Sequence, residues 1–148
     1  MDKAIDLLKQ WTIEYVKSRD VLNDQVSNIV SADDNLVHVK YDDRSRTFVL
    51  CPDQAQLDSL DLSKNVTLIL LNNLGSLDFV LHNWSKLKKS ITVNILFVNP
   101  RSKLEQRWAL NPYTHAKIAD VTSLKRGIIT MSENVDYITM EELIRELS

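Results

Sequence analysis

The chain has 148 residues, of which 44% are hydrophobic and 26% are charged, and its net charge is −2 at neutral pH. This length and balance predict a single globular domain over residues 1–148 with a buried core. A charge so close to zero gives no global reason to bind nucleic acid, and the apolar runs are far too short to span a membrane. We therefore expect neither nucleic acid nor a membrane as a partner.

The rare residue types exclude several common sites. Gly75 and Gly127 are the only glycines, so neither a P-loop nor the glycine-rich dinucleotide motif can be built. Cys51 is the only cysteine, which excludes an internal disulfide and suits a reducing compartment. Charged residues occupy the positions where a signal peptide would carry its apolar core, so we expect a cytoplasmic protein.

The N-terminal part of the chain predicts helices followed by a hairpin. Apolar residues at helical spacing predict one helix over 2–18 and a second over 21–30. Two strands, 36–41 and 46–51, flank a short polar turn and predict an antiparallel β-hairpin. A proline then ends the second strand, and residues 53–62 predict a short helix.

Two long apolar runs, residues 66–71 and 91–98, are the strongest signal in the chain. Near-continuous runs rich in β-branched residues are typical of strands buried on both faces. The intervening residues 74–89 suit one helix, so the three segments predict a right-handed βαβ unit with neighbouring parallel strands. Asn94 is the local conflict, and we expect its amide to hydrogen-bond within the protein, because an unpaired buried amide costs about 1–3 kcal/mol.

The last third of the chain has weaker patterns. Residues 105–112 predict a short strand, and residues 135–138 predict a short edge strand. A helical turn is expected over 115–120, and two further helices follow it. The residues expected to cap helices are Thr114, Ser123 and Thr139, the last with Glu142 at capping-box spacing.

Together these elements predict a three-layer α/β sandwich. Its central sheet would be mostly parallel, with N-terminal helices and the hairpin as an antiparallel edge. The main alternative is a restriction-endonuclease-like core, because helix, three strands, helix and strand can also be read in that order. A magnesium nuclease needs carboxylates and a Glu-x-Lys-like pair on neighbouring strands, and residues 66–73 contain no charge. This alternative therefore predicts an inactive scaffold that does not cleave DNA or RNA.

The expected ligand site lies where the parallel strands end. Ligands of open parallel sheets collect beyond the carboxyl ends of the strands, and asparagine amides with arginine suit an anionic or amide-bearing ligand. Histidine is the side-chain type that titrates closest to neutrality, which makes the one in this region the best acid–base candidate. The residues predicted to bind a ligand are Asn72, Asn73, Asn99, Arg101, Arg107 and His115. The competing interpretation is structural, since asparagine and proline also end strands because they favour turns.

Other candidate sites have less support. No base follows Cys51, which favours a buried and inert thiol. The histidines are scattered without metal-ligand spacing, so we expect neither a metal nor a cofactor. A basic patch is conceivable, although cations at a helix end also fit the helix dipole. The residues that would form this patch are Lys40, Arg44, Arg46, Lys86, Lys88 and Lys89.

The patterns predict function only by class. A binding or protein-interaction module without a readable catalytic motif is the first hypothesis, with an unidentified protein or a small anionic ligand as its partner. A small enzyme or anionic-ligand receptor that uses the strand-end residues is the alternative, and an inactive nuclease-like scaffold is the third. The patterns predict no particular reaction and no oligomeric state.

Overall fold

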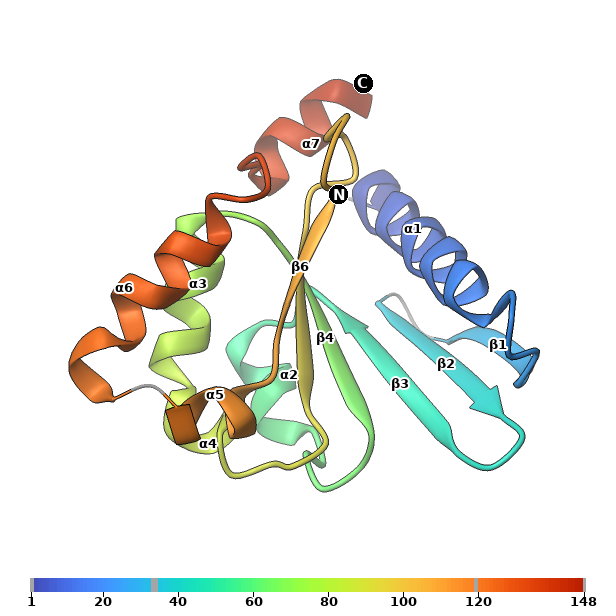
Figure 1. Ribbon diagram of the computed structural model, residues 1–148. Helices are drawn as coiled ribbons and strands as arrows, with labels where there is room; N and C mark the ends of the chain where they lie inside the picture. Colours follow the sequence, from blue (N-terminus) through green and yellow to red (C-terminus); the bar gives the residue numbers. More distant parts are fainter. Residues whose placement is uncertain (1, 33–34, 119, 148) are drawn as a thin grey trace.

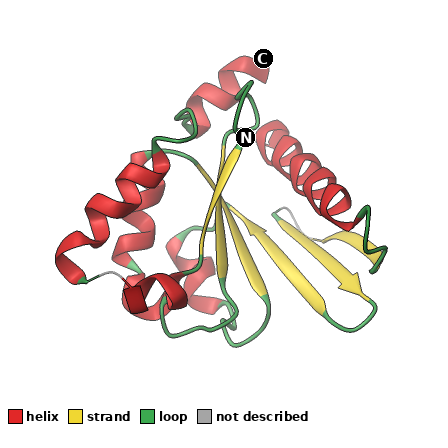
Figure 2. Cartoon of the chain, in the orientation of Figure 1, coloured by secondary structure: helices red, strands yellow, loops and turns green. Residues whose placement is uncertain are grey.

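The computed structural model describes residues 2–32, 35–118 and 120–147, in which one six-stranded sheet is accompanied by seven helices (Figures 1 and 2). The strands are β1 (Val26–Ala32), β2 (Leu36–Tyr41), β3 (Ser45–Leu50), β4 (Val66–Leu71), β5 (Asn94–Val98) and β6 (Arg107–Leu110). The helices are α1 (Asp2–Asp20), α2 (Gln54–Ser59), α3 (Leu74–His82), α4 (Trp84–Leu87), α5 (Pro112–Ile118), α6 (Val121–Ser132) and α7 (Met140–Leu147).

The sheet is mixed, and its strands follow one another in chain order from β1 to β6. The pairs β3–β4 and β4–β5 are parallel, whereas β1–β2, β2–β3 and β5–β6 are antiparallel. This corrects the prediction of a mostly parallel sheet. The predicted hairpin is present as β2 and β3, but β1 forms the edge beyond it, because residues 26–32 are a strand rather than part of a second helix.

The two long apolar runs form neighbouring parallel strands, as predicted. Every residue of β4 is buried, and so are the residues of β5 after its first, although β5 begins only at Asn94. The prediction for that residue is also confirmed, since the Asn94 Oδ1 accepts a hydrogen bond from the Asn111 Nδ2 at 3.0 Å.

Apolar side chains gather on both faces of the sheet. Leu68 and Leu70 of β4 pack on one face with apolar residues of α2, α3, α4 and α6. Ile69 and Leu71 alternate with them and pack on the other face with apolar residues of α1 and α7 (Figure 1). Burial on both faces explains why the strand reads as an uninterrupted apolar run. No helix within the described residues is long and apolar enough to cross a membrane.

The second predicted helix, over residues 21–30, is wrong because α1 ends in a polar turn. The Asp20 carboxylate accepts hydrogen bonds from the backbone N–H groups of Gln25 and Val26, at 2.8 and 3.0 Å. Asp24 adopts a left-handed backbone with φ of 47° and reverses the chain. The β-branched residues that follow pair with β2, which matches their preference for strands.

The single helix predicted between β4 and β5 is divided at Asn83. The Asn83 Nδ2 donates to the Phe79 carbonyl at 2.8 Å, and its amide exchanges two hydrogen bonds with Gln54 of α2, at 2.7 and 3.0 Å. A side chain that bonds the preceding turn and a neighbouring helix competes with continued helix formation. As a result, α3 ends here and the short α4 begins on a new axis (Figure 1).

Helices α5 and α6 begin at caps other than those predicted, whereas α7 begins at the predicted one. Asn111 and Asp120 accept the cap hydrogen bonds at the start of α5 and α6, both at 2.8 Å, in place of Thr114 and Ser123. Residue 119 of the predicted 115–120 turn lies outside the described residues. The capping box is confirmed, because the backbone N–H of Glu142 donates to the Thr139 Oγ1 at 3.1 Å, and the Glu142 carboxylate accepts from the Thr139 N–H at 3.2 Å.

The predicted edge strand over 135–138 is instead an irregular segment that crosses the carboxyl edge of the sheet. Val135 belongs to the core on the α3 face, and Ile138 belongs to the core on the α1 face. The segment therefore passes from one face of the sheet to the other, and it delivers α7 to the side opposite α6 (Figure 1).

Asn72, directly after β4, holds the start of this crossing segment. Its side chain is fully buried, and its Nδ2 donates to the carbonyls of Ser132 and Val135, at 2.9 and 2.8 Å. Its Oδ1 accepts from the Trp108 Nε1 at 2.7 Å. One amide therefore connects β4, β6 and the end of α6 in the interior.

We predict that Asn72→Ala lowers the free energy of unfolding by about 3–5 kcal/mol, because it leaves two buried carbonyls and one indole N–H without partners. Urea denaturation followed by circular dichroism measures the change. Asn134→Ala is the control, since among the described residues this exposed amide bonds just the nearby Met131 carbonyl, and its loss should cost less than about 0.5 kcal/mol. Equal stability of the two variants would contradict the assigned role of Asn72.

Candidate functional site

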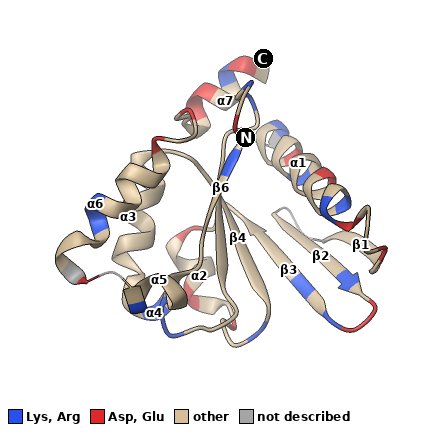
Figure 3. Cartoon of the chain, in the orientation of Figure 1, with Lys and Arg blue, Asp and Glu red and all other residues tan. Residues whose placement is uncertain are grey.

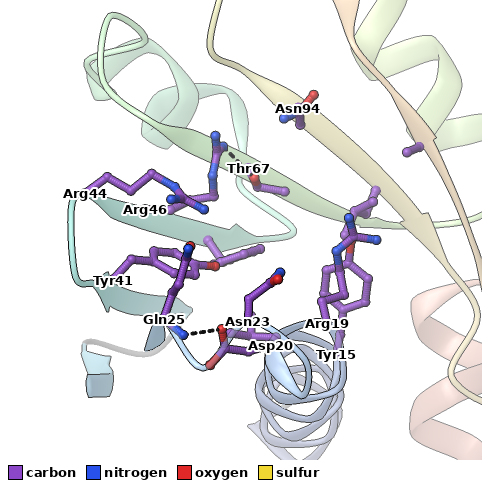
Figure 4. A pocket seen from close by; sticks show the side chains of 14 residues that line it. Tyr15, Arg19, Asp20, Asn23, Gln25, Tyr41, Arg44, Arg46, Thr67 and Asn94 are labelled. Carbon is purple, nitrogen blue, oxygen red and sulfur yellow. Dashed lines mark hydrogen bonds between the residues drawn. The ribbon is translucent and has the colours of Figure 1, made fainter. Parts of the chain in front are cut away.

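A cavity of about 420 Å³ opens on the α1 face of the sheet, at the amino ends of the parallel strands (Figure 4). The last turns of α1 form one wall, and the end of the β2–β3 hairpin forms another. The lining residues are Tyr15, Val16, Arg19, Asp20, Asn23, Gln25, Tyr41, Arg44, Arg46, Phe48, Thr67, Asn94, Leu96 and Ala109.

A row of polar side chains crosses the sheet beneath this cavity. Arg46 lies near the start of β3, Thr67 near the start of β4, and Asn94 at the start of β5. The register places Thr67 directly beside Asn94. All three lie on the α1 face, which is apolar farther along the same strands. These polar residues interrupt the apolar pattern of that face, although Thr67 itself is buried, and departures of this kind are expected at functional sites.

Arg46 is the central cation of the cavity, and it is partly buried. Its Nη1 donates to the Thr67 Oγ1 at 2.9 Å and to the Thr92 carbonyl at 3.4 Å. Within the described residues no carboxylate forms an ion pair with it. Burial is the main cause that lowers the pKa of Arg46, as expected for a cation removed from water without an opposite charge.

Arg44 and Tyr41 form a second group on the hairpin wall. The Arg44 guanidinium lies 4.3 Å from the centroid of the Tyr41 ring, and its Nη1 also pairs with the Asp43 carboxylate at 2.9 Å. Burial raises the pKa of the Tyr41 phenol, an effect that Arg44 and Arg46 partly oppose. The phenol therefore keeps its proton at neutral pH and can donate a hydrogen bond into the cavity.

Tyr15 contacts two further arginines, of which Arg19 lines the opposite wall of the cavity. Its ring stacks on Trp11 one helical turn earlier, with centroids 5.4 Å apart. The guanidinium groups of Arg107 and Arg19 lie 4.9 and 5.6 Å from the centroid of the same ring. Cation–π contacts fix the direction of a guanidinium while leaving its N–H groups able to bind an anion.

Asp20 is a carboxylate among the lining residues of the cavity. Both of its oxygens accept hydrogen bonds from the backbone after α1, as described above, and Figure 4 shows this contact at the base of the wall. This carboxylate is therefore used to close the turn, and within the part of the chain that the structure describes it forms no ion pair with the arginines. The cavity keeps an excess of positive charge.

The asparagines predicted to bind a ligand at the carboxyl ends of the strands hold the crossing segment. Besides the bonds of Asn72, the Asn73 Nδ2 donates to the Ile138 carbonyl at 2.8 Å and the Asn99 Nδ2 donates to the Asp136 carbonyl at 3.0 Å. The Asn73 Oδ1 also caps α3. The structure thus brings the three asparagines together at one edge, where their amides bind backbone groups of the chain itself.

The charged residues of the predicted site are dispersed. Arg101 pairs with Glu146 of α7 at 2.7 Å, and Arg107 lies over Tyr15. His115 lies on α5, which follows β6 at the opposite edge of the sheet from the asparagines. Its ring packs edge-on against Trp84, and its Nε2 is buried without a hydrogen bond from the described residues. The structure does not bring His115 together with the strand-end asparagines.

A smaller cavity of about 260 Å³ does occur near the carboxyl ends of β3 and β4, and its lining is mainly apolar. Cys51, Asn73, Phe79 and Met140 are among its lining residues. Cys51 has a left-handed backbone with φ of 47°, and burial raises the pKa of its thiol to about 11. A thiol that remains protonated is a poor nucleophile, so this cavity offers little reactive chemistry.

The basic residues considered as a patch do not share one face. Lys40 and Arg46 point to opposite faces of the sheet, since Arg46 lies opposite Val39 in the β2–β3 register. The Lys86 Nζ donates to the Leu57 carbonyl at 2.9 Å and pairs with Asp58 at 3.5 Å, on the α2 side. Figure 3 shows acidic residues interspersed among the basic ones over the molecule.

Among the residues that are described, no three His, Cys, Asp or Glu side chains are placed to hold a metal ion.

Sequence reasoning missed the cavity because it searched the carboxyl ends of the strands. The sequence does contain an indication of this cavity. Asn94 is the polar residue that interrupts the second apolar run, and Thr67 is a polar residue in the first. The sequence patterns place Arg46 in the candidate basic patch and do not connect it with Asn94 or Thr67. The contribution of Tyr15 and Arg19 depends on where α1 crosses the sheet, which no local pattern specifies.

No protein-family model, curated protein or solved structure matches this chain. The functional assignment therefore depends on the chemistry of the cavity alone.

We predict that Cys51 resists alkylation in the native protein. With a pKa of about 11, its thiolate fraction at pH 8 should make reaction with iodoacetamide on the order of 100-fold slower than in the urea-unfolded chain. Mass spectrometry of timed samples measures both rates, and the native rate should rise with pH up to about 11. Equal native and unfolded rates at pH 8 would show that the thiol is neither buried nor protonated.

Proposed function

We propose that this protein is a binding module for a small anionic ligand, which it receives in the arginine-lined cavity beneath α1. The observation that carries the proposal is Arg46, a partly buried cation at the floor of a cavity, without a carboxylate partner among the described residues. The scaffold that presents it is an α/β sheet with helices packed on each side, which accords with a three-layer arrangement.

Burying a cation without an opposite charge is unfavourable, and an anion bound beside it would remove that cost. Among the described residues the hydrogen bonds of the Arg46 guanidinium all come from its Nη1, so its other N–H groups can donate to a ligand. Arg44 and Arg19 add positive charge on opposite walls. Guanidinium groups bind phosphate and carboxylate oxygens in a bidentate manner, which suits a compact oxyanion.

The earlier hypothesis of an anion site at the carboxyl ends of the strands remains a proposal with a different key residue. There Arg101 would bind the ligand, with Asn72, Asn99 and His115. The internal hydrogen bonds of the asparagines and the Arg101–Glu146 pair make that edge the weaker candidate. Because each site has its own arginine, substitution separates the two.

We expect inorganic phosphate to bind the wild-type protein with a dissociation constant of about 1 mM or tighter, as measured by isothermal titration calorimetry at low salt. Arg46→Gln should weaken binding about tenfold or more, because it removes the charge while keeping a donor for Thr67. Arg101→Ala should leave binding unchanged.

Thermal melting of both variants checks that they remain folded. Loss of phosphate binding in Arg101→Ala, with normal binding in Arg46→Gln, would move the site to the carboxyl ends of the strands. Normal binding in Arg46→Gln at unchanged stability would contradict the proposed site.

A further inference from the structure

The cavity that contains Arg46 has a neutral polar side as well as a cationic side. The side-chain amides of Asn23, Gln25 and Asn94 line it together with the hydroxyl of Tyr41 (Figure 4). Among the described residues, the side chains of Asn23 and Gln25 make no hydrogen bond, and the Asn94 amide is engaged through its Oδ1. Donors and acceptors without internal partners are available to a ligand.

The charges around the cavity favour a single compact anionic group. Arg44 and Arg46 lie together on the hairpin side. The Nη1 of Arg44 pairs with Asp43, so a phosphate group would contact its other N–H groups together with those of Arg46. Asp20 lies in the wall, and Asp42 and Asp43 lie in the adjacent hairpin turn. A polyphosphate or a polynucleotide would extend past the arginines toward these carboxylates and be repelled by them.

The two tyrosine rings of the cavity already make stacking or cation–π contacts. Tyr15 stacks on Trp11 and lies under Arg107, and the Tyr41 ring lies under Arg44. Recognition of a nucleobase usually includes stacking on an aromatic face, and both tyrosines that line the cavity already have a guanidinium over the ring. The amides instead suit a ligand body that carries hydroxyl groups, which both donate and accept hydrogen bonds.

We infer, on the basis of the proposed anion site, that the ligand is a phosphomonoester of a small polyhydroxylated compound, as in a sugar phosphate. Arg44 and Arg46 bind the phosphate oxygens, and the amides of Asn23, Gln25 and Asn94 bind hydroxyl groups of the body. The volume of about 420 Å³ lies within the usual range of small-ligand sites, roughly 300–1,000 Å³.

Calorimetric titration of the full chain with five probes tests this assignment. The probes are inorganic phosphate, glucose 6-phosphate, ribose 5-phosphate, adenosine monophosphate and glucose. We expect at least one sugar phosphate to bind about tenfold or more tightly than inorganic phosphate, because the hydroxyl contacts add to the phosphate contacts. Adenosine monophosphate should bind less tightly than the better sugar phosphate, and glucose alone should give no measurable binding.

The double variant Asn23→Ala/Gln25→Ala separates the two sides of the cavity. These exposed side chains make no internal hydrogen bond among the described residues, so the fold should be retained. We expect the variant to bind inorganic phosphate like the wild type but to lose the additional affinity for sugar phosphates. Arg46→Gln should weaken the binding of both kinds of probe.

The outcomes separate a failure of the sugar-phosphate assignment alone from a failure of the anion site as well. If inorganic phosphate binds through Arg46 and neither sugar phosphate binds more tightly, the anion site stands and the sugar-phosphate assignment is overturned. Adenosine monophosphate binding more tightly than both sugar phosphates overturns it in favour of a nucleotide. If none of the anionic probes binds, both the anion site and the sugar-phosphate assignment are contradicted.

Discussion

The architecture depends on the buried amide of Asn72. Through its two donors and one acceptor it joins the end of β4 to Trp108 of β6 and to the segment that leaves α6. The chain can then cross the edge of the sheet at this point, and α7 reaches the side opposite α6 and contacts α1. A polar group in this position is stable only because all of its hydrogen bonds are made inside the protein.

Arg46 differs from Asn72, because no described residue neutralises its charge. Its guanidinium is partly removed from water, and its described neighbours supply hydroxyl and carbonyl oxygens but no carboxylate. Proteins that need a charge only for structure usually pair it, since an unpaired buried charge is destabilising. Arg101, near the other end of the strands, does have such a partner, because Glu146 lies 2.7 Å from it.

The sequence patterns correctly predicted the elements that are determined by residues close together in the chain. The β2–β3 hairpin, the buried β4–β5 pair and the capping box at Thr139 follow from alternation, apolar runs and cap spacing. The patterns failed where a side chain overrode them. Asn83 divides a helix, and Asp20 ends α1, so that residues with helical spacing become β1.

The candidate site could be predicted less well than the fold, for a physical reason. Its walls come from α1, from the hairpin and from three strands, and only packing brings these elements together. The asparagines at the carboxyl ends were correctly recognised as polar groups gathered at one edge. Their hydrogen bonds to the crossing segment join residues far apart in the chain, such as Asn72 and Val135, which are 63 positions apart and which no local pattern connects.

The strand order has a consequence for how the chain folds as it is synthesised. Because β1 to β6 lie in the sheet in the order of the sequence, each strand emerging from the ribosome can add to the edge formed by the one before it. The sheet therefore grows in one direction, but until β6 is released its growing edge is the buried, apolar strand β5. If synthesis pauses between β5 and β6, the nascent chain exposes the unpaired backbone of β5 at the edge of the sheet. Exposed apolar edge strands tend to pair with strands of other chains.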